Sequence, residues 1–226
     1  MHNLGLTQKF CTWIFFAMLF VGCGHVAQSV QEEETPAQLM SEGLQYMDRG
    51  HNEAAAEAFQ KIKDRYPYSK FAVEAELKLA DALFERWLYD EAFDAYSEFE
   101  RLHPKNPNIP YVIYQRGMCH FEQVSTVDRD QSHTLQAKKE FERLVKKFPD
   151  SKYASMASRK TRRCYMNLGE HELYVGHFYY RTKNYGAAVG RYLYILNNYP
   201  DLGQYHEALE SLSKCRAALT EEEGSK

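Results

Sequence analysis

Apolar residues recur along this chain at helical spacing, and four segments repeat one arrangement of apolar positions. In each segment an alanine is followed four residues later by an aromatic residue and, eight residues further on, by a proline. A proline at that place ends a helix, because its ring removes a backbone donor and clashes with the preceding turn. The pattern therefore predicts four equivalent helices. The triplets are Ala55-Phe59-Pro67, Ala92-Tyr96-Pro104, Ala137-Phe141-Pro149 and Ala188-Tyr192-Pro200.

A small residue precedes the alanine by twelve positions in three of the segments, as Gly43, Ala80 and Gly176. In the third segment the matching Gly117 lies twenty residues before Ala137, which reveals an eight-residue insertion. This arrangement resembles the tetratricopeptide consensus, in which small residues let helix A and helix B of a pair approach closely. Stacked pairs bury a shared core and leave a concave groove. The prediction is an all-α tetratricopeptide solenoid of about ten helices.

Breaks in the pattern set the expected boundaries. Gly50-His51-Asn52 should separate the helices of the first pair, Ser69 is a candidate N-cap for the second pair, and Asp150 or Ser151 should cap an extra helix over 150–168. Residues 220–226 are expected to form a disordered tail. The predicted pairs span 37–67, 69–104, 107–149 and 169–200, within a solenoid over 37–219 that a helix over 204–219 caps.

The N-terminal region has the pattern of a secretory signal. Thirteen apolar residues, 10–22, are too few for a spanning helix, which needs about twenty. The sequence Leu19-Phe20-Val21-Gly22-Cys23 resembles a bacterial lipoprotein box, although Phe20 stands where leucine is usual. We expect a lipoprotein signal peptide over 1–22, a lipid anchor on Cys23 and an acidic flexible linker over 23–36. The alternative is ordinary signal cleavage that leaves Cys23 as a free thiol.

Composition and motifs argue against catalysis and nucleic-acid binding. The net charge of −3 offers no basic excess for a nucleic acid. No His-Glu-x-x-His, Cys-x-x-Cys or glycine-rich phosphate loop occurs. Asp128-x-Asp130-x-Ser132 begins like a calcium loop, but His133 replaces the required glycine and Lys139 the required glutamate. We expect no enzyme activity, metal or cofactor. The cysteines after Cys23 should be buried thiols: Cys119, Cys164 and Cys215.

The remaining class of function is recognition of another polypeptide by the protein surface. The helix A positions that face the groove of such a solenoid carry an apolar and aromatic stripe, suited to an extended segment with aromatic side chains. Tyr111 and Tyr114 are the strongest candidates, because tyrosine tolerates partial exposure. Equally, several of these side chains would simply pack against the next helix. The predicted groove residues are Leu44, Met47, Leu77, Phe84, Tyr111, Tyr114, Met118 and Phe121.

The segment from Asn106 to Gly117, Asn-Pro-Asn-Ile-Pro-Tyr-Val-Ile-Tyr-Gln-Arg-Gly, resembles the turn that opens the third repeat in the BamD (ComL) family of outer-membrane lipoproteins. The long turn of the third repeat is also a feature of that family. With the lipoprotein signal, the resemblance covers nearly the whole chain. It continues through Val127-Asp128-Arg129-Asp130 with His133, Phe141, Leu144-Val145, Phe148-Pro149, Ser151, Tyr153, Tyr174-Val175, Tyr179-Tyr180 and Tyr185.

The resemblance implies a non-catalytic subunit of the β-barrel assembly machinery, anchored by lipid to the periplasmic side of the outer membrane. The N-terminal repeats would receive unfolded outer-membrane protein. The C-terminal arm, 169–219, would dock the POTRA domains of the barrel subunit BamA, with Arg191 the charged residue of greatest interest. Other lipoproteins of the machinery are further expected partners. The alternative is a tetratricopeptide pilotin that escorts secretin subunits.

Overall fold

The computed structural model describes residues 33–199 and 203–224, and every regular element in these ranges is an α-helix. The helices belong to one compact unit, Thr35–Lys226. The predicted signal peptide and Cys23 lie outside the described residues. No described helix has the length and apolarity needed to cross a membrane. The helices are α2 (Pro36–Asp48), α3 (Asn52–Arg65), α4 (Ala72–Glu85), α5 (Tyr89–Leu102), α6 (Ile109–Phe121), α7 (Ser132–Lys147), α8 (Lys152–Arg181), α9 (Tyr185–Asn198) and α10 (Gln204–Gly224).

Each predicted pair is present, and its helices meet where the small residue lies. A Cβ atom added to Gly43 would lie 2.5 Å from Cε1 of Phe59, a separation that real Cβ atoms do not adopt. Gly117 stands in the same relation to Phe141 at 2.5 Å, and Gly176 to Tyr192 at 2.6 Å. The aromatic ring of helix B therefore rests directly on the backbone of helix A. This contact explains why a side chain larger than hydrogen is absent at these positions.

The prolines act as predicted on the ends of the B helices. The residue before each proline cannot adopt the helical conformation comfortably, because the proline ring crowds it. Tyr66, before Pro67, has φ −130° and ψ 50°, and His103, before Pro104, has φ −123° and ψ 53°. Phe148 and Tyr199 have closely similar angles. Helices α3, α5, α7 and α9 thus each end at the residue directly before this pre-proline residue, by the same mechanism.

The turns from helix A to helix B also share a conformation. Gly50, Trp87 and Lys183 have φ between 61° and 74°, and each follows its helix A by two residues. In each turn the next residue's N–H bonds back to a helix carbonyl, as in His51 to Tyr46 at 2.8 Å. This pattern is a Schellman C-cap. It confirms the predicted break at Gly50 and places two non-glycine residues in the left-handed region.

Two boundaries and one cap differ from prediction. The extra helix over 150–168 and the first helix of the fourth pair are one continuous helix, α8, because no residue between Leu168 and Leu173 breaks the hydrogen-bond ladder and Gly169 is tolerated inside it. Helix α10 continues through Gly224, so the described part of the expected tail is helical. Ser151 caps α8 through its side chain, as predicted. Ser69 caps nothing; α4 begins after Phe71.

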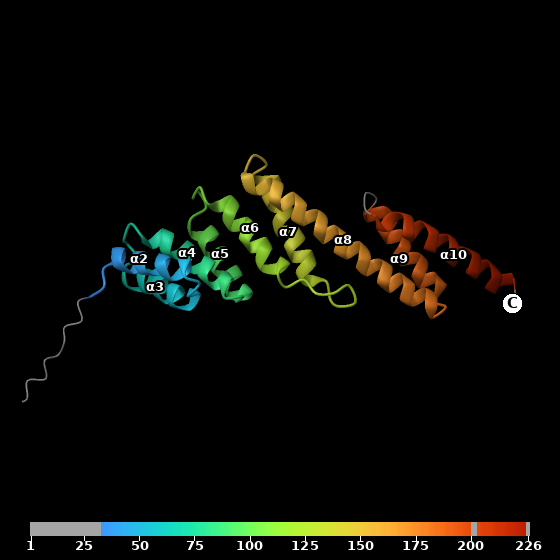
Figure 1. Ribbon diagram of the computed structural model, residues 1–226. Helices are drawn as coiled ribbons and strands as arrows, with labels where there is room; N and C mark the ends of the chain where they lie inside the picture. Colours follow the sequence, from blue (N-terminus) through green and yellow to red (C-terminus); the bar gives the residue numbers. More distant parts are fainter. Residues whose placement is uncertain (1–32, 200–202, 225–226) are drawn as a thin grey trace, which may run out of the picture. The chain divides into compact units, whose positions relative to one another are not determined.

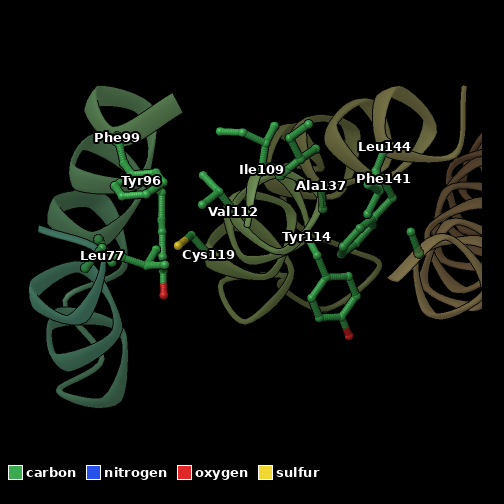
Figure 2. Close-up of a cluster of buried hydrophobic side chains, with 14 of the residues drawn as sticks. Leu77, Tyr96, Phe99, Ile109, Val112, Tyr114, Cys119, Ala137, Phe141 and Leu144 are labelled. Atoms are coloured by element: carbon green, nitrogen blue, oxygen red, sulfur yellow. The ribbon is translucent and has the colours of Figure 1, made fainter. Parts of the chain in front are cut away.

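The buried side chains form three clusters along the pairs, centred on α2–α4, on α4–α8 and on α8–α10. The middle cluster is the largest. Figure 2 shows Ile109 and Val112 of α6 between Tyr96 on one side and Phe141 and Leu144 on the other, so α6 packs against both the second and the third pair. The insertion that follows α6 is held to α8 through His171, whose Nδ1 lies 2.6 Å from the carbonyl oxygen of Val127.

Candidate functional site

A buried carboxylate on α4, Asp81, organises the polar contacts between the second and third pairs. The hydroxyl of Tyr96 donates to Asp81 Oδ1 at 2.8 Å, and the hydroxyl of Tyr111 donates to the same oxygen at 2.8 Å. Lys78 donates to Oδ2 at 3.2 Å. A buried charge is stable only when it is paired and hydrogen-bonded, and these three donors meet that requirement. The network ties α4, α5 and α6 together at one point.

The two tyrosines of this network stay protonated. Burial raises the pKa of Tyr96 well above its ordinary value, and the neighbouring Asp81 carboxylate raises it further. The same two causes raise the pKa of Tyr111. Both hydroxyls are therefore donors throughout the neutral and mildly alkaline range, and the network does not depend on their titration there.

Beside this network lies an open groove of about 480 Å³ between α4, the turn before α6 and the start of α8. Its lining is mixed: apolar and aromatic side chains lie beside a rim of two lysines, two asparagines and the carboxylate of Glu74. Apolar surface with a few convergent polar groups is typical of ligand-binding sites. The lining includes Lys70, Val73, Leu77, Lys78, Asn106, Asn108, Tyr111 and Tyr153.

A row of aromatic rings continues from the groove into the core. Tyr111 contacts Tyr96 with ring centroids 6.4 Å apart, and Tyr153 with centroids 5.5 Å apart. Tyr153 in turn lies 5.8 Å from Tyr114, which lies 5.7 Å from Phe141. Offset and edge contacts of this kind stabilise aromatic pairs beyond the area that they bury. The row holds the groove wall at a fixed geometry, with Tyr111 and Tyr153 at its open end.

The predicted groove residues divide between groove and core. Leu77 and Tyr111 line the groove together. Tyr114 is only 7% exposed, which corrects the expectation that its ring lies open. Met118 and Phe121 pack against the central cluster, where Phe121 contacts Phe141. Of the others, Phe84 rests on Tyr89, Met47 packs against the N-terminal cluster, and Leu44 is exposed on α2.

Sequence reasoning missed Asp81, the centre of the polar network, and Tyr153. A signal for Asp81 was present: it directly follows Ala80, the small residue that packs on helix B, and the aromatic of that helix is tyrosine rather than phenylalanine. A buried phenol needs a hydrogen-bond partner, so a polar residue at that place had a reason to be there. Tyr153 reaches the groove only because α8 packs against α6, a contact that no local pattern encodes.

The predicted docking residue, Arg191, lies on α9 and is partly exposed. Its guanidinium donates to Glu172 Oε2 of α8 at 2.9 Å, and this hydrogen bond raises the pKa of Arg191. Exposed aromatic side chains lie on the same two helices, among them Tyr174 and Phe178 on α8 and Tyr194 on α9. Aromatic residues with an arginine are enriched at the centres of protein interfaces.

The described residues offer little chemistry. The three cysteines are buried free thiols, as predicted, and burial raises the pKa of Cys119 and Cys164 to about 12. A thiol with so high a pKa is a poor nucleophile. Within 33–199 and 203–224, no group of three or more histidine, cysteine, aspartate or glutamate side chains is placed to hold a metal ion.

Comparisons of the sequence with known proteins identify relatives of this chain. Residues 32–226 match the family model YfiO, described as "Outer membrane lipoprotein". The outer membrane protein assembly factor BamD of Rickettsia prowazekii is 33% identical over 207 residues, which cover 92% of this chain and 82% of that protein. BamD of Caulobacter vibrioides is 29% identical over 199 residues, covering 87% of this chain and 65% of that protein.

Among solved structures, a thermophilic tetratricopeptide repeat protein of Thermus thermophilus is similar with a TM-score of 0.44 and 15% identity, over 82% of this chain and 100% of that one. The family model spans the chain from the residues before α2 to the last helix, and the Rickettsia relative covers 92% of the chain. The chain therefore belongs to the YfiO/BamD family of outer membrane lipoproteins.

Proposed function

We propose that this protein is a lipid-anchored, non-catalytic subunit of the machinery that assembles β-barrel proteins in the outer membrane. It binds an unfolded client segment in the groove beside Asp81 and docks BamA through its C-terminal arm. The lipid anchor on Cys23 holds it on the periplasmic side. Its relatives are named outer membrane protein assembly factors, which supports a role in outer-membrane protein assembly. The division of labour within the chain is our proposal.

The observation that carries client binding is the groove itself. Tyr111, Tyr153 and Leu77 offer an apolar and aromatic surface to an extended segment, and the asparagines of the rim offer hydrogen bonds to its backbone. Unfolded outer-membrane proteins carry strand segments with aromatic side chains, which suit such a surface. Because the Asp81 network fixes Tyr111, the groove is formed before the client arrives. Pre-formed sites lose less conformational entropy on binding.

Docking of BamA is assigned to the surface around Arg191. The exposed aromatic residues of α8 and α9 supply apolar contact area, and the Arg191–Glu172 pair supplies charged groups that can exchange partners. A partner that contributes its own carboxylate would replace Glu172 at the guanidinium. Arginine forms such bidentate pairs readily, because its donors are arranged in a fixed fork.

Affinity capture of this protein from gently solubilised envelopes tests its role in outer-membrane protein assembly. Recovery of a barrel protein with POTRA domains, identified by mass spectrometry, is the expected result. Recovery of a secretin in its place would refute the assembly role and favour a pilotin. A matched pair of variants then tests the docking surface. Arg191→Glu should reduce BamA recovery, and the exchange Glu172→Arg with Arg191→Glu, which restores the internal pair, should remain defective.

A further inference from the structure

The turns that lead from a B helix to the next A helix gather at one edge of the Thr35–Lys226 unit. Successive helices are antiparallel neighbours, so the turns α3–α4, α5–α6 and α7–α8 lie at the same end of the pairs (Figure 1). The groove confirms this arrangement, since it is lined by Lys70 from the first turn, Asn106 from the second and Tyr153 from the start of α8. Helix α2 also begins at this edge, at the Thr35 N-cap.

Three lysines lie at this edge, and two of them stand at a helix N-terminus, which does not favour a cation. Lys70 lies two residues before α4, Lys105 lies in the turn before α6, and Lys152 is the first residue of α8. The N-terminus of a helix carries partial positive charge and favours an anion. Acids that suit the helix dipole are present at both edges: Glu74 in the first turn of α4 at this edge, and Glu53 and Asp90 in the first turns of α3 and α5 at the opposite edge.

The three lysines also lack an internal partner. Each is exposed, and among the described residues no carboxylate lies within ion-pair distance of any of them. Two of them instead cover a neighbouring ring: the ammonium of Lys70 lies 5.0 Å from the ring of Phe71, and that of Lys152 lies 5.0 Å from the ring of Tyr153. Helix capping does not explain three cations here, and the ring contacts account for only two of them.

Apolar side chains accompany the charges. Tyr68, in the α3–α4 turn, is fully exposed, and Leu102, at the end of α5, is about half exposed. Tyrosine and lysine together are typical of surfaces that meet the headgroup region of a bilayer, because the ring enters the interface while the ammonium contacts phosphate. We call Lys70, Lys105, Lys152 and Tyr68 the basic edge.

We propose that the basic edge lies against the anionic phospholipid headgroups of the membrane that carries the lipid anchor. Three ammonium groups without an ion-pair partner at one edge argue for this occupant, because an extended anionic surface can contact all three, which a single ion cannot do. This inference rests on the proposed lipid anchor, and the chain enters the helical unit at this edge, at Thr35. The proposal goes beyond client binding and docking, and it gives the groove, which opens beside Lys70, a defined orientation toward the bilayer.

Tryptophan fluorescence tests the proposal on the mature lipidated protein. Cleavage before Cys23 removes Trp13 and leaves Trp87, which is 78% exposed at the opposite edge, as the single tryptophan. A Tyr68→Trp, Trp87→Phe variant moves the reporter to the basic edge, and both substitutions are at exposed sites. Each protein is reconstituted into phosphatidylcholine vesicles with about one third brominated phosphatidylglycerol.

The variant reporter at position 68 should be quenched severalfold more than Trp87. In 1 M salt, where the Debye length falls to about 3 Å, the difference should disappear. Reversing Lys70, Lys105 and Lys152 to glutamate should also abolish it, whereas Lys183→Glu, at the opposite edge, should leave it unchanged. Equal quenching at both positions, or stronger quenching of Trp87, would overturn the proposal.

A second measurement needs no substitution. A membrane-impermeant amine reagent is applied to the wild-type protein on neutral and on anionic vesicles, and modified lysines are quantified by mass spectrometry. Lys70, Lys105 and Lys152 should be protected severalfold on anionic vesicles, while Lys183 is labelled equally on both. Equal labelling of all four lysines on both vesicles would refute the contact.

Discussion

The four helix pairs are of two kinds, and the difference marks the two regions to which functions are assigned. In the first and third pairs the aromatic of helix B is Phe59 or Phe141, and the residue after the small glycine is apolar, Leu44 or Met118. In the second and fourth pairs the aromatic is tyrosine, and the equivalent residue is polar. These pairs are Tyr96 with Asp81 and Tyr192 with His177.

The same backbone contact therefore serves packing alone in one kind of pair and packing with a hydrogen bond in the other. A hydroxyl at the end of the ring reaches across helix A and requires a partner there. In the second pair that partner also holds Tyr111 and shapes the groove. In the fourth pair His177 extends the contact to Glu207 of α10 at 3.1 Å. A polar residue therefore follows the small residue in the two pairs whose helix B aromatic is tyrosine, and there it also links the pair to a further helix, α6 or α10.

The largest effect should come from filling the contact of a phenylalanine pair. Gly117→Ala places a methyl group against the ring of Phe141 and should lower the free energy of unfolding by about 3 kcal/mol. Gly190→Ala is the matched control, because Gly190 lies in α9 with open space around it; the substitution should raise stability by about 0.5 kcal/mol. Urea unfolding followed by circular dichroism measures both. Equal effects of the same sign would contradict the contact.

The partner of the tyrosine hydroxyl should matter more in the second pair than in the fourth. Asp81→Ala leaves the buried hydroxyls of Tyr96 and Tyr111 without their acceptor and should cost about 2 kcal/mol. His177→Ala should cost about 0.5 kcal/mol, because water reaches this partly exposed site. The same unfolding measurement ranks the two variants. A larger loss for His177→Ala would reverse the comparison.

Acid should weaken the junction between the second and third pairs. Burial raises the pKa of the Glu100 carboxyl, but hydrogen bonds and charges from Arg143 and Arg116 outweigh burial and hold that pKa below its ordinary value. A carboxyl whose pKa is lower in the folded than in the unfolded state stabilises the protein at pH values above its unfolded-state pKa. This stabilisation is lost as the pH falls through the folded-state pKa. Stability should therefore fall through this group as the pH drops below the ordinary glutamate pKa.

Glu100→Gln isolates that contribution. The variant should be less stable at neutral pH and should lose part of the acid dependence, since the group that titrates is absent. Unfolding curves collected from pH 7 downward compare it with the wild type. A variant whose stability falls with acid as steeply as that of the wild type would show that other carboxylates dominate.

The smallest effect should come from removing the hydroxyls themselves. Tyr96→Phe should cost about 1 kcal/mol and Tyr192→Phe about 0.5 kcal/mol, because the first hydroxyl bonds a buried carboxylate and the second an accessible histidine. Thermal unfolding of the two variants under one condition measures the difference. If neither substitution changed the unfolding temperature, the hydrogen bonds from these tyrosines to Asp81 and His177 would have no structural role.

Local rules explain how much of the fold could be predicted. The alanine, aromatic and proline spacing located every pair, because a residue before a proline ends each B helix and a small residue lets the aromatic ring approach helix A. The continuity of α8 escaped prediction, since Gly169 can either end a helix or lie inside one, and only packing against α7 and α9 decides between them.

The site was less predictable than the fold for the same reason. The helical period indicates which side chains share a face, but not which of them the next helix covers. Tyr111 and Tyr114 lie on the same helix and have the same chemistry, yet Phe141 and Tyr153 bury Tyr114 while Tyr111 reaches the groove. Asp81 was missed because its partner hydroxyls come from two other helices.

Photo-crosslinking in cells tests most directly which proteins contact the groove and which contact the surface around Arg191. A photo-crosslinking amino acid is placed at Val73, which lines the groove, or at Tyr194, which is exposed near Arg191. We predict adducts with unfolded outer-membrane proteins from position 73 and adducts with BamA from position 194. Clients captured only at 194, or BamA captured only at 73, would contradict the assignment of client binding to the groove.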